Sequence, residues 1–242
     1  MLAGRRPVLE LLRGGGAPER VLLAEPVAAS PAGRELRRRC DGAGVPVGVV
    51  SRAELDRLAP GVNHQGVVAL TARYRYAAPD DLFAGPEPAV LFLDGVTDPH
   101  NLGSLLRSAD GAGFGGVVVR AHGAAGVTAA VRRVSAGAAE VVPVARVANL
   151  GRELERAKQA GLWVVGLDAR GDEDLWATEL LRRPVALVLG SEDRGMSRGV
   201  RERCDALVQI PLGGRLESLN VAVAGAVAMF EVARRSASSA TL

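Results

Sequence analysis

The chain has 242 residues, of which 48% are hydrophobic, 24% charged and 3% aromatic. This composition is typical of a globular protein and excludes a disordered or collagen-like chain. The longest apolar run near the C-terminus covers residues 221–230, which is too short for the roughly 30 Å core of a bilayer. The first residues also lack the pattern of a secretory signal. We therefore expect a cytoplasmic protein without a transmembrane helix.

Two cysteines are present, Cys40 and Cys204, and no CxxC pair occurs. This pattern predicts neither a disulfide framework nor a zinc site. We expect no metal cofactor.

The basic residues are concentrated at the start of the chain. Residues 1–76 hold 12 arginines against 7 acidic residues, whereas the rest of the chain is slightly acidic. Because phosphates attract guanidinium groups, this excess favours contact with a polyanion. A solvated helix surface is an equally good interpretation of the charge alone.

The first 76 residues alternate short apolar runs with amphipathic segments, which is typical of a small α/β unit. Ser51 and Glu54 have the spacing of a capping box, so a helix is expected to begin after Ser51. In chain order we expect a helix at 8–12, a strand at 21–23, a basic helix at 33–40, a strand at 45–50, a helix from 52 and a strand at 67–70.

Residues 77–88 contain three prolines and a glycine, a composition that predicts a linker. Beyond it, strands that are apolar on both faces alternate with helical segments, which indicates a mostly parallel sheet with helices on both faces. The expected strands are 89–93, 116–119, 141–144, 162–167, 185–189 and 207–210. The predicted divisions of the chain are an N-terminal domain at 1–76, a linker at 77–88, a C-terminal domain at 89–235 and a tail at 236–242.

The loop after the strand at 89–93 leads into a helix. Pro99 disfavours a helical residue just before it, and leucines follow Asn101 at helical spacing, so Asn101 is expected to cap this helix. Arg107 lies about 100° from the leucine stripe on a helical wheel and so faces away from this core. Taken alone, Asn101 is interpreted as a cap and Arg107 as a solvated arginine.

A second loop, GSEDRGM at 190–196, follows the strand at 185–189. Glycines directly after a strand let the backbone approach a ligand, and open α/β sheets bind ligands at the carboxyl ends of their strands. The loop lacks both the GKS or GKT of a P-loop and the two glycines of a hydrolase serine elbow. A GxGxxG string at 111–116 precedes a strand instead of following one, which excludes the dinucleotide-binding fingerprint.

The third loop, IPLGGRLESLN at 210–220, leads into the apolar segment at 221–230. A helix that is apolar around its circumference must be buried on nearly all sides, so we expect it at a subunit interface. Ser218 and Asn220 stand where this helix begins. Each is interpreted either as a helix cap or as a hydrogen-bonding group for a ligand.

Together and in this order, the three loops resemble the three signature motifs of the SpoU (TrmH-like) branch of the SPOUT methyltransferases. The first motif is similar to TDPHNLG at 97–103 with Arg107, the second to GSE at 190–192 with GM at 195–196, and the third to IPL at 210–212 with SLN at 218–220. Enzymes of this family transfer a methyl group from S-adenosylmethionine to a ribose 2′-hydroxyl of RNA. The resemblance therefore implies that chemistry and that cofactor.

Residues 1–76 resemble the substrate-binding domain that precedes some SpoU catalytic domains, an α/β fold like a small ribosomal protein. NHQGV at 63–67 is similar to its closing signature. The two-domain layout and the string DGVTDPHN at 94–101 look most like the enzymes that methylate a guanosine of large-subunit ribosomal RNA. The resemblance thus implies that the partner is RNA, with large-subunit ribosomal RNA as the first candidate.

The resemblance also implies a trefoil knot in the C-terminal sheet and an obligate homodimer in which Arg107 comes from the partner subunit. Because a guanidinium is normally never deprotonated, we interpret Arg107 as a cation that binds a phosphate and stabilises developing alkoxide charge. The catalytic residues implied by position are Asn101, Arg107, Glu192, Ser218 and Asn220. The cofactor-binding residues implied are Leu189, Gly190, Ile210, Leu212, Ser218, Leu219 and Asn220. RNA contacts are expected from Arg5, Arg6, Arg37, Arg38, His64 and Arg73.

Alternatives stay open at this point. The same chemistry on transfer RNA or on another ribosomal nucleotide, including positions linked to antibiotic resistance, fits the motifs. A ribosome-assembly factor without turnover is expected to have lost Arg107, Asn101 or Glu192, and all three are present. A SPOUT enzyme that acts on a base is disfavoured by the SLN motif.

Overall fold

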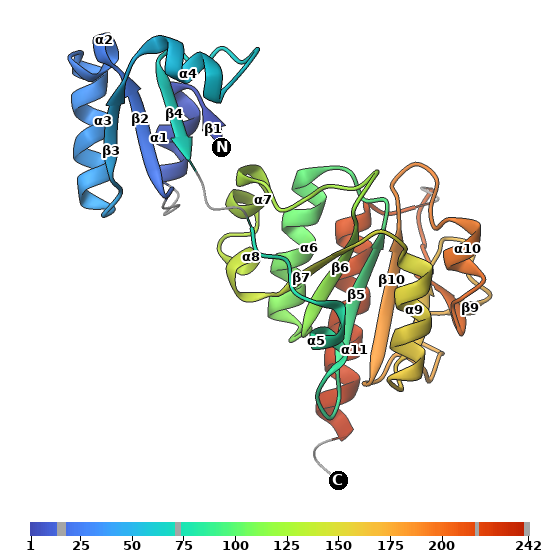
Figure 1. Ribbon diagram of the computed structural model, residues 1–242. Coiled ribbons are helices and arrows are strands. Elements are labelled where there is room, and N and C mark those ends of the chain that lie inside the picture. The colour runs from blue at the N-terminus through green and yellow to red at the C-terminus, as the bar shows by residue number, and fades with distance from the viewer. Residues whose placement is uncertain (14–17, 71–73, 216–217, 240–242) are drawn as a thin grey trace. The chain divides into compact units, whose positions relative to one another are not determined.

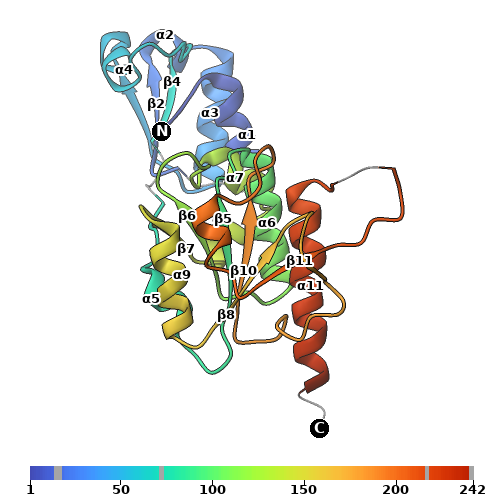
Figure 2. The same cartoon turned by 90° about the vertical axis from the view of Figure 1, so that its right-hand side faces the viewer.

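The computed structural model describes residues 1–13, 18–70, 74–215 and 218–239. Its internal contacts divide the chain into two units, Met1–Tyr74 and Arg75–Leu242. Each unit is built around a sheet of its own (Figures 1 and 2). Within the described ranges, no helix is both long enough and apolar enough to cross a membrane.

The first unit has a four-stranded sheet in the order β1-β4-β2-β3. Strand β4 is antiparallel to both of its neighbours, whereas β2 and β3 are parallel. Its elements in chain order are β1 (Leu2–Ala3), α1 (Arg5–Arg13), β2 (Arg20–Ala24), α2 (Glu25–Ala28), α3 (Pro31–Gly42), β3 (Val47–Val50), α4 (Arg52–Leu58) and β4 (Val67–Leu70).

Alternation along β2 divides its side chains between two small cores. Val21 and Leu23 pack with α1 and α3 on one face, and Leu22 packs with α4 on the other. Figure 2 shows α1 and α3 side by side, with α4 across the strands from them. Ser51 Oγ accepts a hydrogen bond from the backbone N–H of Glu54 over 3.2 Å, so α4 begins where the capping pattern predicts.

The second unit is built on a seven-stranded sheet in the order β7-β6-β5-β10-β8-β11-β9. Every neighbouring pair is parallel, which confirms the expected sheet type. The elements in chain order are α5 (Pro79–Phe83), β5 (Ala89–Asp94), α6 (Pro99–Gly111), β6 (Gly116–Arg120), α7 (Ala129–Val134), α8 (Ala138–Val141), β7 (Val144–Val147), α9 (Leu150–Gln159), β8 (Trp163–Leu167), β9 (Glu173–Asp174), β10 (Val185–Gly190), α10 (Arg198–Arg201), β11 (Ala206–Gln209) and α11 (Val221–Ser239).

Helices cover both faces of this sheet, as expected (Figures 1 and 2). On one face α5 and α9 share a buried cluster with alternate strand residues. On the other face α6 and α11 pack against each other. A Cβ atom on Gly225 of α11 would lie 2.6 Å from side-chain atoms of both Leu105 and Leu189. The glycine therefore lets α11 lie close to α6 and β10.

Three segments differ from the sequence expectations. The stretch 77–88 contains α5, whose Leu82 and Phe83 are buried, so it belongs to the core of the second unit instead of linking two units. The strand expected at 141–144 lies at 144–147, because α8 continues through Val141 and Pro143 has no N–H for a sheet ladder. Helix α11 continues to Ser239, past the predicted boundary at 235. The trefoil knot stays a prediction.

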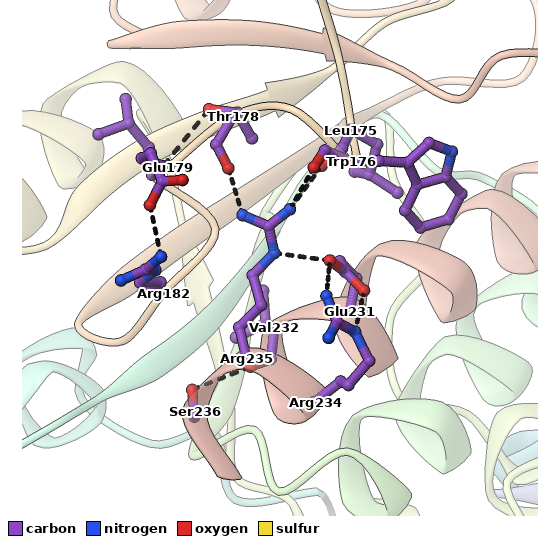
Figure 3. A network of polar contacts seen from close by, with 11 residues as sticks. Leu175, Trp176, Thr178, Glu179, Arg182, Glu231, Val232, Arg234, Arg235 and Ser236 are labelled. Atoms are coloured by element: carbon purple, nitrogen blue, oxygen red, sulfur yellow. Dashed lines mark hydrogen bonds and ion pairs between the residues drawn. The ribbon is translucent and has the colours of Figure 1, made fainter. Parts of the chain in front are cut away.

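The side chain of Arg235 connects the C-terminal half of α11 to the segment after β9 (Figure 3). Arg235 donates to the carbonyl of Trp176 over 2.8 Å, to the carbonyl of Thr178, and to Glu231 over 2.6 Å. Arg234 donates to both carboxylate oxygens of Glu231 over 2.8 Å. These bonds, with Arg234 the largest cause, lower the pKa of Glu231 to about 2 against the opposing effect of burial.

Candidate active site

Three side chains join the three motif loops at the carboxyl edge of the sheet. Asn101 Nδ2 donates a hydrogen bond to Glu192 Oε1 over 2.6 Å, and Asn220 Nδ2 donates to Asn101 Oδ1 over 3.1 Å. Asn220 Oδ1 in turn accepts from the backbone N–H of Ala222 over 2.9 Å, at the start of α11. One continuous set of hydrogen bonds therefore runs from the loop after β10, through α6, to the N-terminus of α11.

The start of α6 leaves the Asn101 side chain free to bond to the other two loops. It also corrects the expectation that Asn101 caps this helix. Asp98, not Asn101, is the N-cap, since its side chain accepts the backbone N–H of His100 over 2.8 Å. Pro99 takes the first helical position, where its missing N–H costs nothing. Asn101 consequently lies inside the first turn, only 9% exposed, with its amide directed at the other two loops.

The loop after β10 is a closed turn. Ser191 and Gly195 exchange two backbone hydrogen bonds of 3.0 Å, and Gly195 has a φ of +66°, which favours glycine. A Cβ atom on Gly190 would lie 2.1 Å from the carbonyl carbon of Gly195, so only glycine fits at the end of β10. The turn holds Glu192 against Asn101.

A cleft of about 960 Å³ lies beside this set of hydrogen bonds. Its walls come from the ends of β8, β10 and β11 and the start of α11. The structure brings all seven residues predicted to bind the cofactor into its lining: Leu189, Gly190, Ile210, Leu212, Ser218, Leu219 and Asn220. Glu192 lines it as well.

The sequence reasoning missed one wall of the cleft, which follows β8. Asp168 accepts the backbone N–H of Arg170 over 2.9 Å, and its other oxygen accepts Nη1 of Arg201 over 2.5 Å. All three residues line the cleft, together with Gln209. Asp168 follows β8 at the carboxyl edge of the parallel sheet, where open α/β sheets bind ligands, so the strand expected at 162–167 is the signal that points to it.

Arg107 is not part of the cleft lining of its own chain. It lies on α6 with its side chain exposed, and it makes no hydrogen bond or ion pair with any residue in the described ranges. Its guanidinium group is therefore available to a group from outside this chain.

The residues predicted to contact RNA differ in their exposure. Arg5 and Arg6 on α1 and Arg38 on α3 are exposed, whereas Arg37 is half-buried. These arginines lie on the two helices that share one face of the first sheet (Figure 2). Arg73 lies outside the described residues.

The burial of His64 differs from the prediction that this side chain contacts RNA. His64 is only 2% exposed, its Nδ1 accepts the backbone N–H of Gly66 over 3.0 Å, and its Nε2 lies 2.8 Å from Asp56 Oδ1. Because Nδ1 is an acceptor, Nε2 carries the proton and donates to Asp56. Both ring nitrogens are thus used inside the protein, and His64 orders the turn before β4.

Comparison with known proteins identifies the family. A model of the SpoU rRNA Methylase family matches residues 88–230, which is more than half of the chain. The chain belongs to this family. A model described as RNA 2′-O ribose methyltransferase substrate binding matches residues 1–77. This SpoU protein is therefore an S-adenosylmethionine-dependent RNA 2′-O-ribose methyltransferase.

Two relatives and a solved structure cover most of the SpoU chain. YacO of Bacillus subtilis, named for the TrmH family of tRNA/rRNA methyltransferases, is 42% identical over 96% of this chain and 94% of its own. The 23S rRNA (guanosine-2′-O-)-methyltransferase RlmB of Pseudomonas aeruginosa is 46% identical over 79% of this chain and 78% of its own. The crystal structure of AviRb from Streptomyces viridochromogenes with AdoMet matches with a TM-score of 0.65 at 28% identity, covering 97% of this chain and 89% of that one.

The cleft suits S-adenosylmethionine. Its volume lies in the range of about 300–1,000 Å³ that is usual for small-molecule sites. Leu189, Leu219 and Ala224 provide apolar surface for a nucleobase, and Ser218 and Gln209 provide polar groups. Among the described residues, no group of three or more His, Cys, Asp or Glu side chains is arranged to hold a metal ion.

Proposed function

We propose that this SpoU methyltransferase modifies a guanosine ribose of large-subunit ribosomal RNA. The observation that carries the proposal is the 46% identity to the RlmB of Pseudomonas aeruginosa, whose name specifies 23S rRNA and guanosine-2′-O methylation. Transfer RNA is the second candidate, since the name of the Bacillus subtilis relative includes both RNA classes.

We propose that the seven predicted cofactor residues hold S-adenosylmethionine in the cleft. The bound cofactor supplies an electrophilic methyl group on a sulfonium. Methyl transfer requires the ribose 2′-oxygen in line with the methyl carbon, so positioning supplies much of the rate. The hydrogen bonds from Glu192 through Asn101 to Asn220 fix the three loops that surround this position. Ser218, on the same wall as Asn220, contributes a hydroxyl to it.

The protein acts as a homodimer in this proposal, with the outward face of α11 at the interface. Val223 and Phe230 are each 51% exposed, and they lie seven residues apart, two helical turns, on one face. Gly111 of α6 lies against this face, because a Cβ atom on it would be 3.4 Å from Phe230 Cζ. An apolar strip of this kind on a helix is typical of a subunit contact.

Arg107 lies one helical turn before Gly111, so it stands at the border of the proposed interface. A second copy on this face would bring the partner's Arg107 toward the first copy's cleft. There the guanidinium binds an RNA phosphate and stabilises the negative charge that develops on the 2′-oxygen. A guanidinium is normally never deprotonated in a protein, so it is a poor base and a good cation.

The test is incubation of the purified protein with methyl-labelled S-adenosylmethionine and either unmodified 23S rRNA transcript or bulk transfer RNA, followed by mapping of 2′-O-methyl sites. A single guanosine in 23S rRNA supports the proposal. Label in transfer RNA alone moves the substrate to the second candidate, and labelled bases in place of riboses contradict the ribose chemistry.

A further inference from the structure

A row of three residues crosses the centre of the large sheet at its carboxyl edge. Strands β10 and β5 are neighbours in the sheet (Figure 1), and Gly190 of β10 is in register with Asp94 of β5. Leu93 of β5 is in register with Val119 of β6, so the next residue of each strand places Arg120 beside Asp94. Adjacent strands lie about 4.8 Å apart, which puts the backbone of Arg120 about 10 Å from that of Gly190 in the cofactor cleft.

The carboxylate of Asp94 connects the two outer members of this row. Its side chain is 1% exposed. One oxygen accepts the backbone N–H of Ser197 over 2.7 Å, directly after the turn that holds Glu192, and the other accepts Nη1 of Arg120 over 3.1 Å. A buried carboxylate requires such partners, and among the described residues Arg120 is its one charged partner.

Arg120 is only partly used by this contact. Its side chain is 42% exposed, and Asp94 takes one of the five N–H donors of the guanidinium. The loop that follows is fixed, since the backbone N–H of Ala125 donates to the carbonyl of Val96 over 2.8 Å. The Arg120 side chain is thus held by Asp94 at the end of β6 and is still partly exposed, beside the loop that leads to Asn101. A planar guanidinium in this arrangement is suited to a phosphate.

We propose that Arg120 binds a backbone phosphate of the RNA next to the target ribose, in a position set by Asp94. The inference rests on the proposed function, because it needs an RNA strand at this edge of the sheet. The same carboxylate holds Ser197, so phosphate binding and the turn that carries Glu192 share one support. Arg120 and the cleft lie close enough for one RNA strand to reach both.

The test compares Arg120→Gln with Arg182→Gln in filter binding of unmodified 23S rRNA transcript at several salt concentrations. Arg182 is a matched control, an exposed arginine 2.5 Å from Glu179 that precedes β10 at the opposite edge of the sheet. We expect Arg120→Gln to weaken RNA binding about tenfold. It should also reduce the slope of log affinity against log salt by about 0.7. The control should match the wild type.

A second variant separates phosphate binding from support of the buried carboxylate. Asp94→Asn combined with Arg120→Gln removes both charges and keeps an oxygen for Ser197, so the fold does not contain an unpaired carboxylate. We expect RNA binding to remain weak in this double variant, with the Kd for S-adenosylmethionine within about twofold of wild type. Wild-type RNA affinity in the double variant, or in Arg120→Gln, would overturn the inference.

The proposed substrate and the proposed phosphate site can be disproved independently of each other. Methylation mapping of the wild type decides the substrate. An Arg120-dependent salt slope without a methylated guanosine supports the phosphate site and removes the proposed substrate. A methylated guanosine with an unchanged slope removes the phosphate site alone.

Discussion

Asn101 donates a hydrogen bond of 2.6 Å to Glu192, although the two residues are 91 positions apart in the chain. Asn220, a further 28 positions along, donates to the same Asn101. The central amide therefore holds together loops that no local sequence pattern connects. Its position in the first turn of α6 depends on the cap at Asp98.

Replacing this amide tests whether it positions the loops. We expect Asn101→Ala to reduce kcat about 100-fold, because a displacement of about 1 Å at the reacting centre has that effect. Asn149→Ala is the control: Asn149 caps α9 through the backbone N–H of Arg152 over 3.0 Å. It should cost about 1 kcal/mol of stability and leave kcat unchanged. Equal activity of the two variants would contradict the role of Asn101.

The tight approach at Gly190 predicts a specific sensitivity to one added methyl group. In Gly190→Ala the new Cβ meets the backbone of Gly195 at 2.1 Å, so the turn must shift. Overpacking of this kind costs about 1–3 kcal/mol. If the cofactor needs the original turn, its Kd rises about tenfold or more. Gly213→Ala, where nothing lies within 4 Å of an added Cβ, should bind normally in the same calorimetric titration.

A subunit-mixing experiment tests the origin of Arg107. We expect Arg107→Ala to abolish turnover while leaving cofactor binding intact, because the side chain is outside the cleft of its own chain. Mixed dimers of Arg107→Ala with Gly190→Ala contain one site with an intact cleft and an intact arginine from the other subunit. Activity should return on mixing. Purified mixed dimers that stay inactive would place Arg107 elsewhere.

The stability of the C-terminal domain should depend on pH through Glu231. Its folded pKa of about 2 lies below the ordinary value of 4.5, chiefly because of the hydrogen bond from Arg234. The stabilisation is therefore fully present above pH 4.5 and is lost as the pH falls toward 2. The side chain is 6% exposed, so the effect is of the order of 2 kcal/mol.

Urea unfolding of wild type and Glu231→Gln measures this difference. At pH 7 the wild type should have the higher free energy of unfolding, and its difference from Glu231→Gln should become smaller as the pH approaches 3. Glu179→Gln removes a carboxylate that is 75% exposed and paired with Arg182. This variant should shift the midpoint of urea unfolding little at any pH. If the difference in unfolding free energy between wild type and Glu231→Gln does not depend on pH, the ionisation of Glu231 is not involved.

The parallel sheet and the three loops at its edge could be predicted because each depends on local patterns: apolar runs, and glycine or proline at strand ends. The cofactor-binding residues that line the cleft were implied only by the resemblance of those loops to the SpoU motifs. The hydrogen bonds of Asn101 could not be predicted, because they depend on where α6 starts. The sequence pattern predicts the cap at Asn101, whereas the helix begins at Pro99 with Asp98 as its cap. The burial of His64 and the helix at 79–83 were missed for a related reason. Both depend on tertiary contacts, with Asp56 and with the large sheet.

The strand order of the second unit has a consequence for synthesis. β5 lies between β6 and β10, and β10 begins at Val185, about ninety residues after β5 ends. At translation rates of about 5–20 residues per second, roughly 5–20 seconds pass between the synthesis of β5 and that of β10. During this time one edge of β5, a strand that is buried in the folded protein, has no partner strand. A nascent chain in that interval presents an unpaired apolar edge, which is where aggregation begins. A ribosome-bound chaperone that shields residues 89–94 during this interval should raise the yield of folded protein.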